Sequence, residues 1–94
     1  MERLTVGTVE YMRVHVEDRS QQISELPASL TYDVKAPDDT FKYNAQAGNR
    51  IGMTAYCLLD TTGWAVGQYR LYVRFPVSPE LPLLGPLPFL VDDG

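Results

Sequence analysis

Hydrophobic and polar residues alternate with a period of two in several short stretches of this 94-residue chain, which is the pattern of half-buried β-strands. We predict strands at residues 3–6, 10–16, 30–34, 40–43, 53–59, 67–75 and 87–91. In the clearest stretch, the residues predicted to face a core are Tyr69, Leu71, Val73 and Phe75. Residues 53–59 are apolar on both faces, which is typical of a central, well-covered strand.

The same alternation assigns faces to two other predicted strands. The residues predicted to face the core are Met12, Val14, Val16, Leu30, Tyr32 and Val34. Val14 is therefore expected to be buried, together with Leu71 and Val73 of the clearest strand. Asp33 lies between two inward residues and is expected to face solvent. A register error of one residue would reverse every one of these assignments.

Turn-forming residues separate the predicted strands at residues 36–39, 47–49 and 60–63. Residues 17–25 are polar and lack a strand pattern, so they predict a loop. No stretch has a clear helical period. Short strands joined by local turns favour antiparallel pairing, so the sequence predicts an all-β fold, a small antiparallel immunoglobulin-like β-sandwich.

One spacing supports this fold class. Gly67 is followed two residues later by Tyr69, at the entrance to a strand of alternating hydrophobic residues. That arrangement is typical of the tyrosine corner of Greek-key sandwiches, in which the phenol bonds a nearby backbone group. Trp64, in the turn before this strand, is expected to close one end of the core.

Proline distribution divides the chain. Five of the seven prolines lie in residues 76–94, and proline cannot donate a hydrogen bond to a sheet ladder. We expect one domain overall, with a sandwich core in residues 1–75 and a Pro-rich extended segment in residues 76–94 that forms an edge strand at most. Two interpretations stay open for its apolar residues: they close the sandwich, or they dock on a neighbouring subunit. The leucines assigned to that docking strip are Leu81, Leu83 and Leu84.

Composition limits the classes of partner. The formal net charge of −4 argues against nucleic acid and against anionic membranes. No apolar run approaches the ~20 residues that span a bilayer. The single cysteine, Cys57, excludes an intrachain disulfide and suits synthesis in a reducing cytoplasm. We expect neither a membrane nor a nucleic-acid partner.

Few residues suggest chemistry. His15, the one histidine, lies on an outward strand face, and a general base needs a nucleophile or an orienting carboxylate beside it. Cys57 is expected to be a small core hydrophobe. Asp38 and Asp39 are adjacent but lack the spacing of a calcium-binding loop. We therefore expect no catalytic residue, no cofactor and no bound metal.

Tyrosine and arginine mark the outward faces of two predicted strands. The residues are Tyr11, Arg13 and His15 on one strand and Arg70, Tyr72 and Arg74 on the other. Both types are enriched at protein interfaces, so these residues are candidates for contacts with a partner. The alternative is that both faces are solvated.

The order of these features resembles a known family. From the strand at residues 10–16 to the segment Gly67-Gln-Tyr-Arg-Leu-Tyr-Val-Arg74 and the following Pro79-Glu80, the chain is similar to small β-sandwich virion proteins of actinobacterial tailed phages. The resemblance spans about residues 4–91. The family often carries tryptophans in the middle region, where this chain has Phe41 and Tyr43.

The resemblance implies a non-enzymatic structural or accessory protein of the virion, made in the host bacterial cytoplasm. Its expected place is the head–tail connector, or neck, with copies of itself arranged symmetrically around the portal and the adaptor. One alternative is a decoration (cement) protein on the major capsid protein lattice. Another, from a different class, is a free-standing immunoglobulin-like module that binds glycan or peptide.

Overall fold

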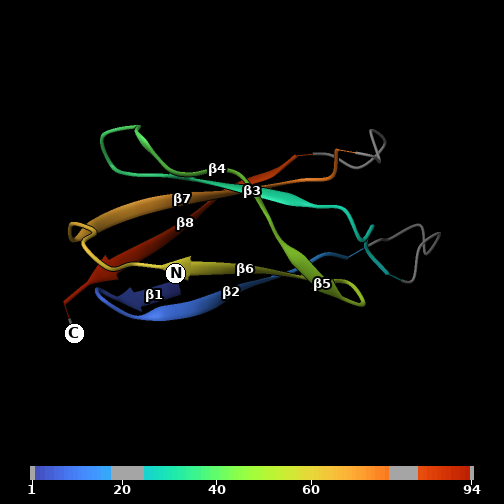
Figure 1. The fold of residues 1–94 in the computed structure, drawn as a ribbon, viewed down its shortest axis with the longest axis horizontal. Helices are drawn as coiled ribbons and strands as arrows, with labels where there is room; N and C mark the ends of the chain where they lie inside the picture. Colours follow the sequence, from blue (N-terminus) through green and yellow to red (C-terminus); the bar gives the residue numbers. More distant parts are fainter. Residues whose placement is uncertain (1, 18–24, 77–82, 94) are drawn as a thin grey trace.

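Two β-sheets pack face to face in this chain, whose computed structural model describes residues 2–17, 25–76 and 83–93 (Figure 1). One sheet has five strands in the order β1-β8-β7-β3-β4: β1 at Glu2–Thr5, β8 at Leu84–Asp92, β7 at Gly67–Arg74, β3 at Thr31–Lys35 and β4 at Phe41–Ala47. The other has three strands in the order β2-β6-β5: β2 at Val9–His15, β6 at Thr54–Asp60 and β5 at Asn49–Ile51. The predicted all-β sandwich is confirmed. The described residues hold no helix that is long and apolar enough to cross a membrane.

The strand order is that of an immunoglobulin sandwich. In such domains, strands C, F and G form one sheet, and strands B, E and D belong to the other. Here β3, β7 and β8 take the first set of places, with β4 added beside β3, while β2, β6 and β5 take the second. One pairing departs from the antiparallel prediction, because β1 runs parallel to β8.

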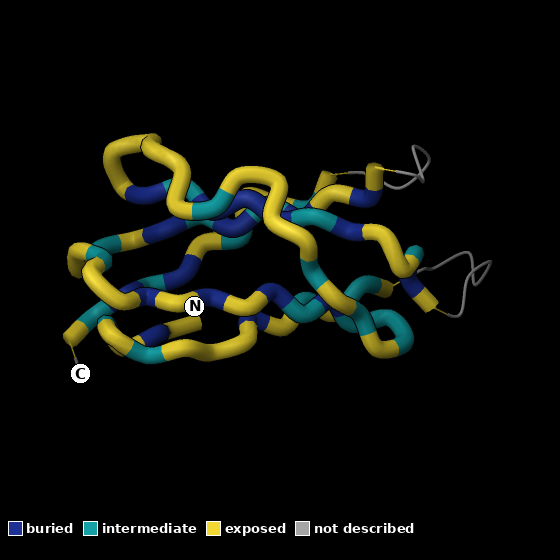
Figure 2. Tube along the Cα trace, in the orientation of Figure 1, coloured by how far each residue is buried: buried dark blue, intermediate teal, exposed yellow. Residues whose placement is uncertain are grey.

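The predicted inward faces form the core between the sheets. Leu71 and Val73 of β7 are fully buried, as are Val34 of β3 and Cys57 and Leu59 of β6. Figure 2 shows buried and exposed segments alternating along both layers, as the period of two requires. The inward faces read from the sequence are therefore right on β7 and β3.

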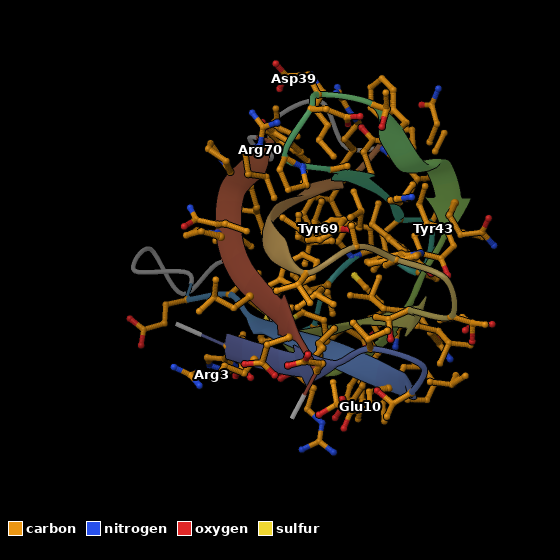
Figure 3. All side chains as sticks on the ribbon, turned by 90° about the vertical axis from the view of Figure 1, so that its left-hand side faces the viewer. Arg3, Glu10, Asp39, Tyr43, Tyr69 and Arg70 are labelled. Atoms are coloured by element: carbon orange, nitrogen blue, oxygen red, sulfur yellow. The ribbon has the colours of Figure 1, made fainter. Side chains whose placement is uncertain are left out.

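The tyrosine corner is present. The Tyr69 hydroxyl donates a hydrogen bond to the carbonyl oxygen of Ala65, 2.7 Å away. Trp64 stacks on the Tyr69 ring with 4.9 Å between ring centroids, and Phe89 stacks on it at 5.8 Å. Figure 3 shows Tyr69 inside the sandwich. Trp64 is half-buried against the core, so the predicted closing role of this tryptophan agrees with the structure.

Residues 47–49 were expected to turn, and that prediction is wrong. The chain runs from β4 in the five-stranded sheet directly into β5 in the three-stranded sheet. Gly48 makes this crossing possible, because a Cβ there would lie only 2.3 Å from the Leu30 side chain. The Gly48 N–H also donates to the Leu30 carbonyl oxygen at 3.0 Å. Gly48 therefore allows the backbone to lie close to Leu30, and it does not reverse the direction of the chain.

The expected edge strand at the C-terminal end is only partly an edge. Phe89 and Val91 of β8 are fully buried, and β1 and β7 both flank β8 at residues 89–91. Pro86 and Pro88 fall in the other half of β8, which pairs with β7 alone. The prolines therefore lie in the half of β8 that has a neighbouring strand on one side only, where a residue without an N–H is tolerated. Residues 77–82, including Leu81, and most of the predicted loop at 17–25 lie outside the described residues.

Two burial predictions need correction. Asp33 was expected to face solvent, yet it is only 4% exposed. Its carboxylate accepts hydrogen bonds from the Ala45 N–H at 2.6 Å and from Arg74 Nε at 3.0 Å, and these neighbours cover it. Val14 was expected to be buried and is half-buried, because β2 lies at the edge of its sheet beside a groove.

Candidate functional site

The outer surface of the three-stranded sheet collects exposed apolar and aromatic side chains. On β2, Met12 faces the core, so the odd-numbered residues face outward. Strand pairing sets Tyr11 opposite Leu58, Arg13 opposite Tyr56, and Ile51 opposite Thr54. We call this surface the β2–β6–β5 face; it consists of Val9, Tyr11, Arg13, His15, Ile51, Thr54, Tyr56 and Leu58.

Exposure singles out this face. Seven large hydrophobic residues are exposed among those described, and four of them, Val9, Tyr11, Ile51 and Leu58, lie here with exposed fractions from 40% to 68%. Scattered exposed hydrophobic residues are ordinary on protein surfaces, whereas a contiguous group marks an interaction site. The pairing of β2 with β6 makes Val9, Tyr11 and Leu58 contiguous, and the half-buried Tyr56 lies between these residues and Ile51 of β5.

A cation lies among these rings. The Arg13 guanidinium carbon is 5.8 Å from the centre of the Tyr56 ring, and Tyr11 meets Tyr56 edge to face at 6.1 Å. Among the arginines that the structure describes, only Arg13 has no carboxylate within ion-pair distance. A cation–π contact at an exposed site leaves the guanidinium N–H groups free to donate. Arg13 is therefore available to a carboxylate or carbonyl of a partner.

His15 does not form a catalytic arrangement with the described residues. Its Nδ1 lies 3.2 Å from the hydroxyl of Thr54, directly across the ladder. Within the described part of the chain, no carboxylate is hydrogen-bonded to the imidazole. The pair lacks the orienting group that a general base requires, so we treat His15 as part of the surface.

The second predicted stripe lies on the opposite outer surface, so the structure does not bring the two stripes together. Arg70 donates to the Asp39 carboxylate and, at 3.1 Å, to the Ala36 carbonyl oxygen. Figure 3 shows Arg70 and Asp39 side by side. The hydrogen bond from Arg70 lowers the pKa of Asp39. Arg70 is thus tied to its own domain.

The rest of this stripe is engaged in the same way. Arg74 pairs with the buried Asp33, whose carboxylate also holds the Ala45 N–H of β4. The Lys35 ammonium lies 5.9 Å from the centre of the Tyr72 ring. These contacts give the Arg70, Tyr72 and Arg74 stripe a role inside the sheet, so it is a weaker candidate for partner contact than the β2–β6–β5 face.

Of the docking strip proposed at the C-terminal end, Leu83 and Leu84 can be placed. Leu83 is 46% exposed and lines an open hollow of about 410 Å³ together with Phe75 and Pro76. Leu84 is half-buried against the core. Leu83 therefore remains a candidate contact, separate from the β2–β6–β5 face.

Five residues of the face were missed by the sequence reasoning: Val9, Ile51, Thr54, Tyr56 and Leu58. The signal for the last two was the apolar character of both faces of residues 53–59, which we interpreted as cover from within the protein. β6 is central in its sheet, but none of the described residues covers Leu58, which is 40% exposed. Ile51 belongs to β5, a three-residue strand with too short a pattern to predict.

Other chemistry has little support in the geometry. Cys57 is fully buried, and burial raises the pKa of its thiol to about 12, so it stays protonated. Asp38 accepts hydrogen bonds from the Thr40 N–H at 3.1 Å and from its hydroxyl at 2.7 Å, and these lower the pKa of the Asp38 carboxyl. Among the described residues, no three His, Cys, Asp or Glu side chains are grouped so as to hold a metal ion.

Comparison with known proteins adds no relative: no family model matches this chain, and neither a curated protein nor a solved structure matches it. The resemblance to phage virion proteins therefore stays a prediction that depends on the residues quoted for it. The β2–β6–β5 face is the surface from which a function can be argued.

Proposed function

We propose that this domain is a non-enzymatic structural protein that works by packing its β2–β6–β5 face against a partner protein. The observation that carries the proposal is the contiguous exposed apolar group around Arg13, the described arginine without a carboxylate partner. Tyrosine and arginine are the side chains that most often contribute large shares of binding energy at interfaces.

The face also predicts the chemistry of that partner. Fully burying a large apolar side chain contributes about 1.5–3 kcal/mol, so covering Tyr11, Ile51 and Leu58 favours an apolar partner surface. Arg13 would be costly to bury without an acceptor. The complementary surface therefore has an apolar centre and a carboxylate or backbone carbonyl placed to meet Arg13.

For the biological setting, we propose a structural or accessory component of a tailed-phage virion, at the head–tail connector beside the portal and adaptor. The support is the resemblance described above. In addition, a small sandwich with one exposed apolar surface, the β2–β6–β5 face, suits assembly around a larger symmetric body. A capsid decoration protein is the alternative within this setting. Copy number separates them, because a neck ring holds few copies per particle and a capsid lattice holds many.

A glycan-binding module fits this face less well. Sugar rings stack on flat aromatic platforms, whereas the Tyr11 and Tyr56 rings meet at an interplanar angle of 82°. The two rings therefore do not form one continuous platform. Binding of the purified protein to a glycan array would nevertheless support this alternative over the structural role.

Paired surface variants test the proposal. The face variant combines Tyr11→Ser with Leu58→Ser, and the matched control combines Phe41→Ser with Val66→Ser, which removes exposed apolar side chains elsewhere. Both variants should fold with the unfolding midpoint of the unsubstituted protein. Occupancy in purified particles, measured by quantitative mass spectrometry, should fall about tenfold or more for the face variant, since 1.4 kcal/mol is tenfold in affinity. The control should assemble normally. A folded face variant at full occupancy would overturn the proposal.

A further inference from the structure

The open strand edges of the two sheets differ in how well they are protected. Strand edges attract other chains, and proteins block them with short strands, bulges, lysine or proline. β1 has four residues and β5 has three; β4 carries Lys42 and a bulge at Ala45, whose φ is positive; and the free half of β8 contains Pro86 and Pro88. β2 is seven residues long, without proline or lysine, and regular in register with β6. Its charged side chains are Glu10 and Arg13, which makes it the least protected of these edges without leaving it wholly uncharged.

Alternate residues of β2 form backbone hydrogen bonds to β6, and this alternation shows which backbone N–H and C=O groups point to the open edge. Thr61 N–H donates to the Thr8 carbonyl oxygen at one end of the ladder, and Val16 N–H donates to the Met53 carbonyl oxygen at the other. In an antiparallel pair, bonded positions alternate with positions that point away. Even-numbered residues therefore bond β6, and the N–H and C=O groups of Val9, Tyr11, Arg13 and His15 point to the open edge.

There is room beside this edge. A groove of about 300 Å³ runs between β2 and the five-stranded sheet, lined by Met12, Val14, Leu71, Leu87 and Pro88 among others. In constant-type immunoglobulin domains, a further strand flanks strand B at this position. Here the first strand, β1, pairs with β8 instead, so none of the described strands is paired with the open edge of β2. Glu2 and Leu4 of β1 line a small hollow next to Tyr11, Met12 and Arg13 without joining this sheet.

We propose that β2 of a second copy of this chain occupies that place, antiparallel to β2 and related to it by a two-fold axis. The two three-stranded sheets then join into one sheet in the order β5-β6-β2-β2-β6-β5. The partner is a second copy because the strand is complementary to itself. The register that overlaps all seven residues is centred on Met12, and it sets Arg13 opposite Tyr11 of the second copy and Val9 opposite His15.

Charge distinguishes this register from its neighbours. With Arg13 opposite Tyr11, each copy gains a cross-strand cation–π contact, and no like charges lie directly opposite. A slip of two residues in one direction would set Arg13 against Arg13, which is unfavourable. A slip in the other direction pairs Tyr11 with Tyr11 and shortens the overlap. A slip of one residue would turn every side chain to the wrong face.

The inference does not depend on the virion setting, but it extends the interaction surface. Pairing through the edge leaves the outer surface of the sheet exposed in both copies. Two β2–β6–β5 faces would then lie side by side and present Ile51, Tyr56 and Leu58 twice. A two-fold interface of this kind is the commonest closed symmetry of soluble proteins.

Sedimentation equilibrium over a wide range of protein concentration tests the proposal. The unsubstituted protein should dimerise. Arg13→Pro removes an N–H that points to the open edge, without removing a bond to β6, and should be monomeric. Arg13→Ala is the matched control: it keeps the N–H and loses only the side chain, and with it one cation–π contact per copy. Its dimer should therefore weaken about 5- to 30-fold and still form at high protein concentration. Equal dimerisation of the two variants, or a monomeric unsubstituted protein at every concentration, would overturn the proposal.

Amide hydrogen exchange on the unsubstituted protein tests the same edge without a variant. Exchange of the Tyr11 and Arg13 amides should slow as the protein concentration rises, while the Met12 amide, bonded to β6, stays protected throughout. A dimer in which the Tyr11 and Arg13 amides stay unprotected would overturn the proposed register. A monomeric protein would leave the proposed partner contact of the β2–β6–β5 face intact, so the two proposals fail separately.

Discussion

The Tyr69→Phe substitution removes one hydrogen bond from the tyrosine corner and little else. The hydroxyl of Tyr69 donates to the Ala65 carbonyl oxygen at 2.7 Å, and the ring is 1% exposed between Trp64 and Phe89. Phenylalanine keeps that ring and its stacking. Any loss of stability therefore reports the bond that holds the 61–66 turn against the start of β7.

The expected loss follows from the surroundings of the acceptor. A protein hydrogen bond contributes about 0.5–1.5 kcal/mol net, and stranding a buried acceptor costs about 1–3 kcal/mol. Ala65 is exposed, so its carbonyl can bond water when the phenol is gone. We expect about 1 kcal/mol, which corresponds to a fall in Tm of roughly 4–8 °C for a domain of this size.

Urea unfolding measured by tryptophan fluorescence gives the free energy of unfolding and its slope. The matched control is Tyr11→Phe, because Tyr11 is exposed and its hydroxyl has no hydrogen bond among the described residues. The control should change stability by less than about 0.5 kcal/mol, as exposed substitutions usually do. If Tyr69→Phe is as stable as the control, the tyrosine corner does not stabilise this fold and the reasoning is refuted.

Three further predictions concern the core and the titrating groups. Leu71→Ala should cost about 2–4 kcal/mol in urea unfolding, because Leu71 is fully buried; a loss below about 1 kcal/mol would contradict its place in the core. The Cys57 thiol, with its pKa raised to about 12, should resist Ellman's reagent at pH 8 until the protein unfolds, when one thiol per chain reacts; rapid reaction of the native protein would contradict its burial. Asp39, whose pKa is lowered by Arg70, binds its proton less readily folded than unfolded. Its stabilising contribution is therefore present above the unfolded pKa near 3.8 and lost as the pH falls through the lower folded value. Asp39→Asn, which also suits the positive φ at this position, should be less stable than the unsubstituted protein at neutral pH, with the difference vanishing in acid; a difference independent of pH would contradict the ion pair.

The sequence pattern predicted what local rules determine. In β7 and β3 one face is covered by the other sheet, so the period of two placed Leu71, Val73 and Val34 correctly in the core. The Gly67-Gln-Tyr69 spacing predicted the tyrosine corner because both members of that contact lie close together in the chain. Such features need no knowledge of which strands pair.

The sequence pattern did not predict features that depend on contacts between residues far apart in the chain. Asp33 is buried because Arg74, distant in sequence, and the N–H of Ala45 on a bulged strand meet its carboxylate. Gly48 looked like a turn residue because its close approach to Leu30 exists only once the sheets pack. The β2–β6–β5 face was half predicted: Tyr11, Arg13 and His15 alternate clearly, whereas Leu58 is exposed because none of the described residues covers this side of β6.

The central claim is that this chain acts by packing its β2–β6–β5 face against a neighbour in a particle. A cryo-electron microscopy reconstruction of phage particles assembled in cells that express this chain tests it most directly. Under this account, the domain occupies density at the head–tail connector with Tyr11, Arg13 and Leu58 buried against a neighbouring protein. Absence of the chain from the particle, or a placement in which this face points to solvent, would contradict the account.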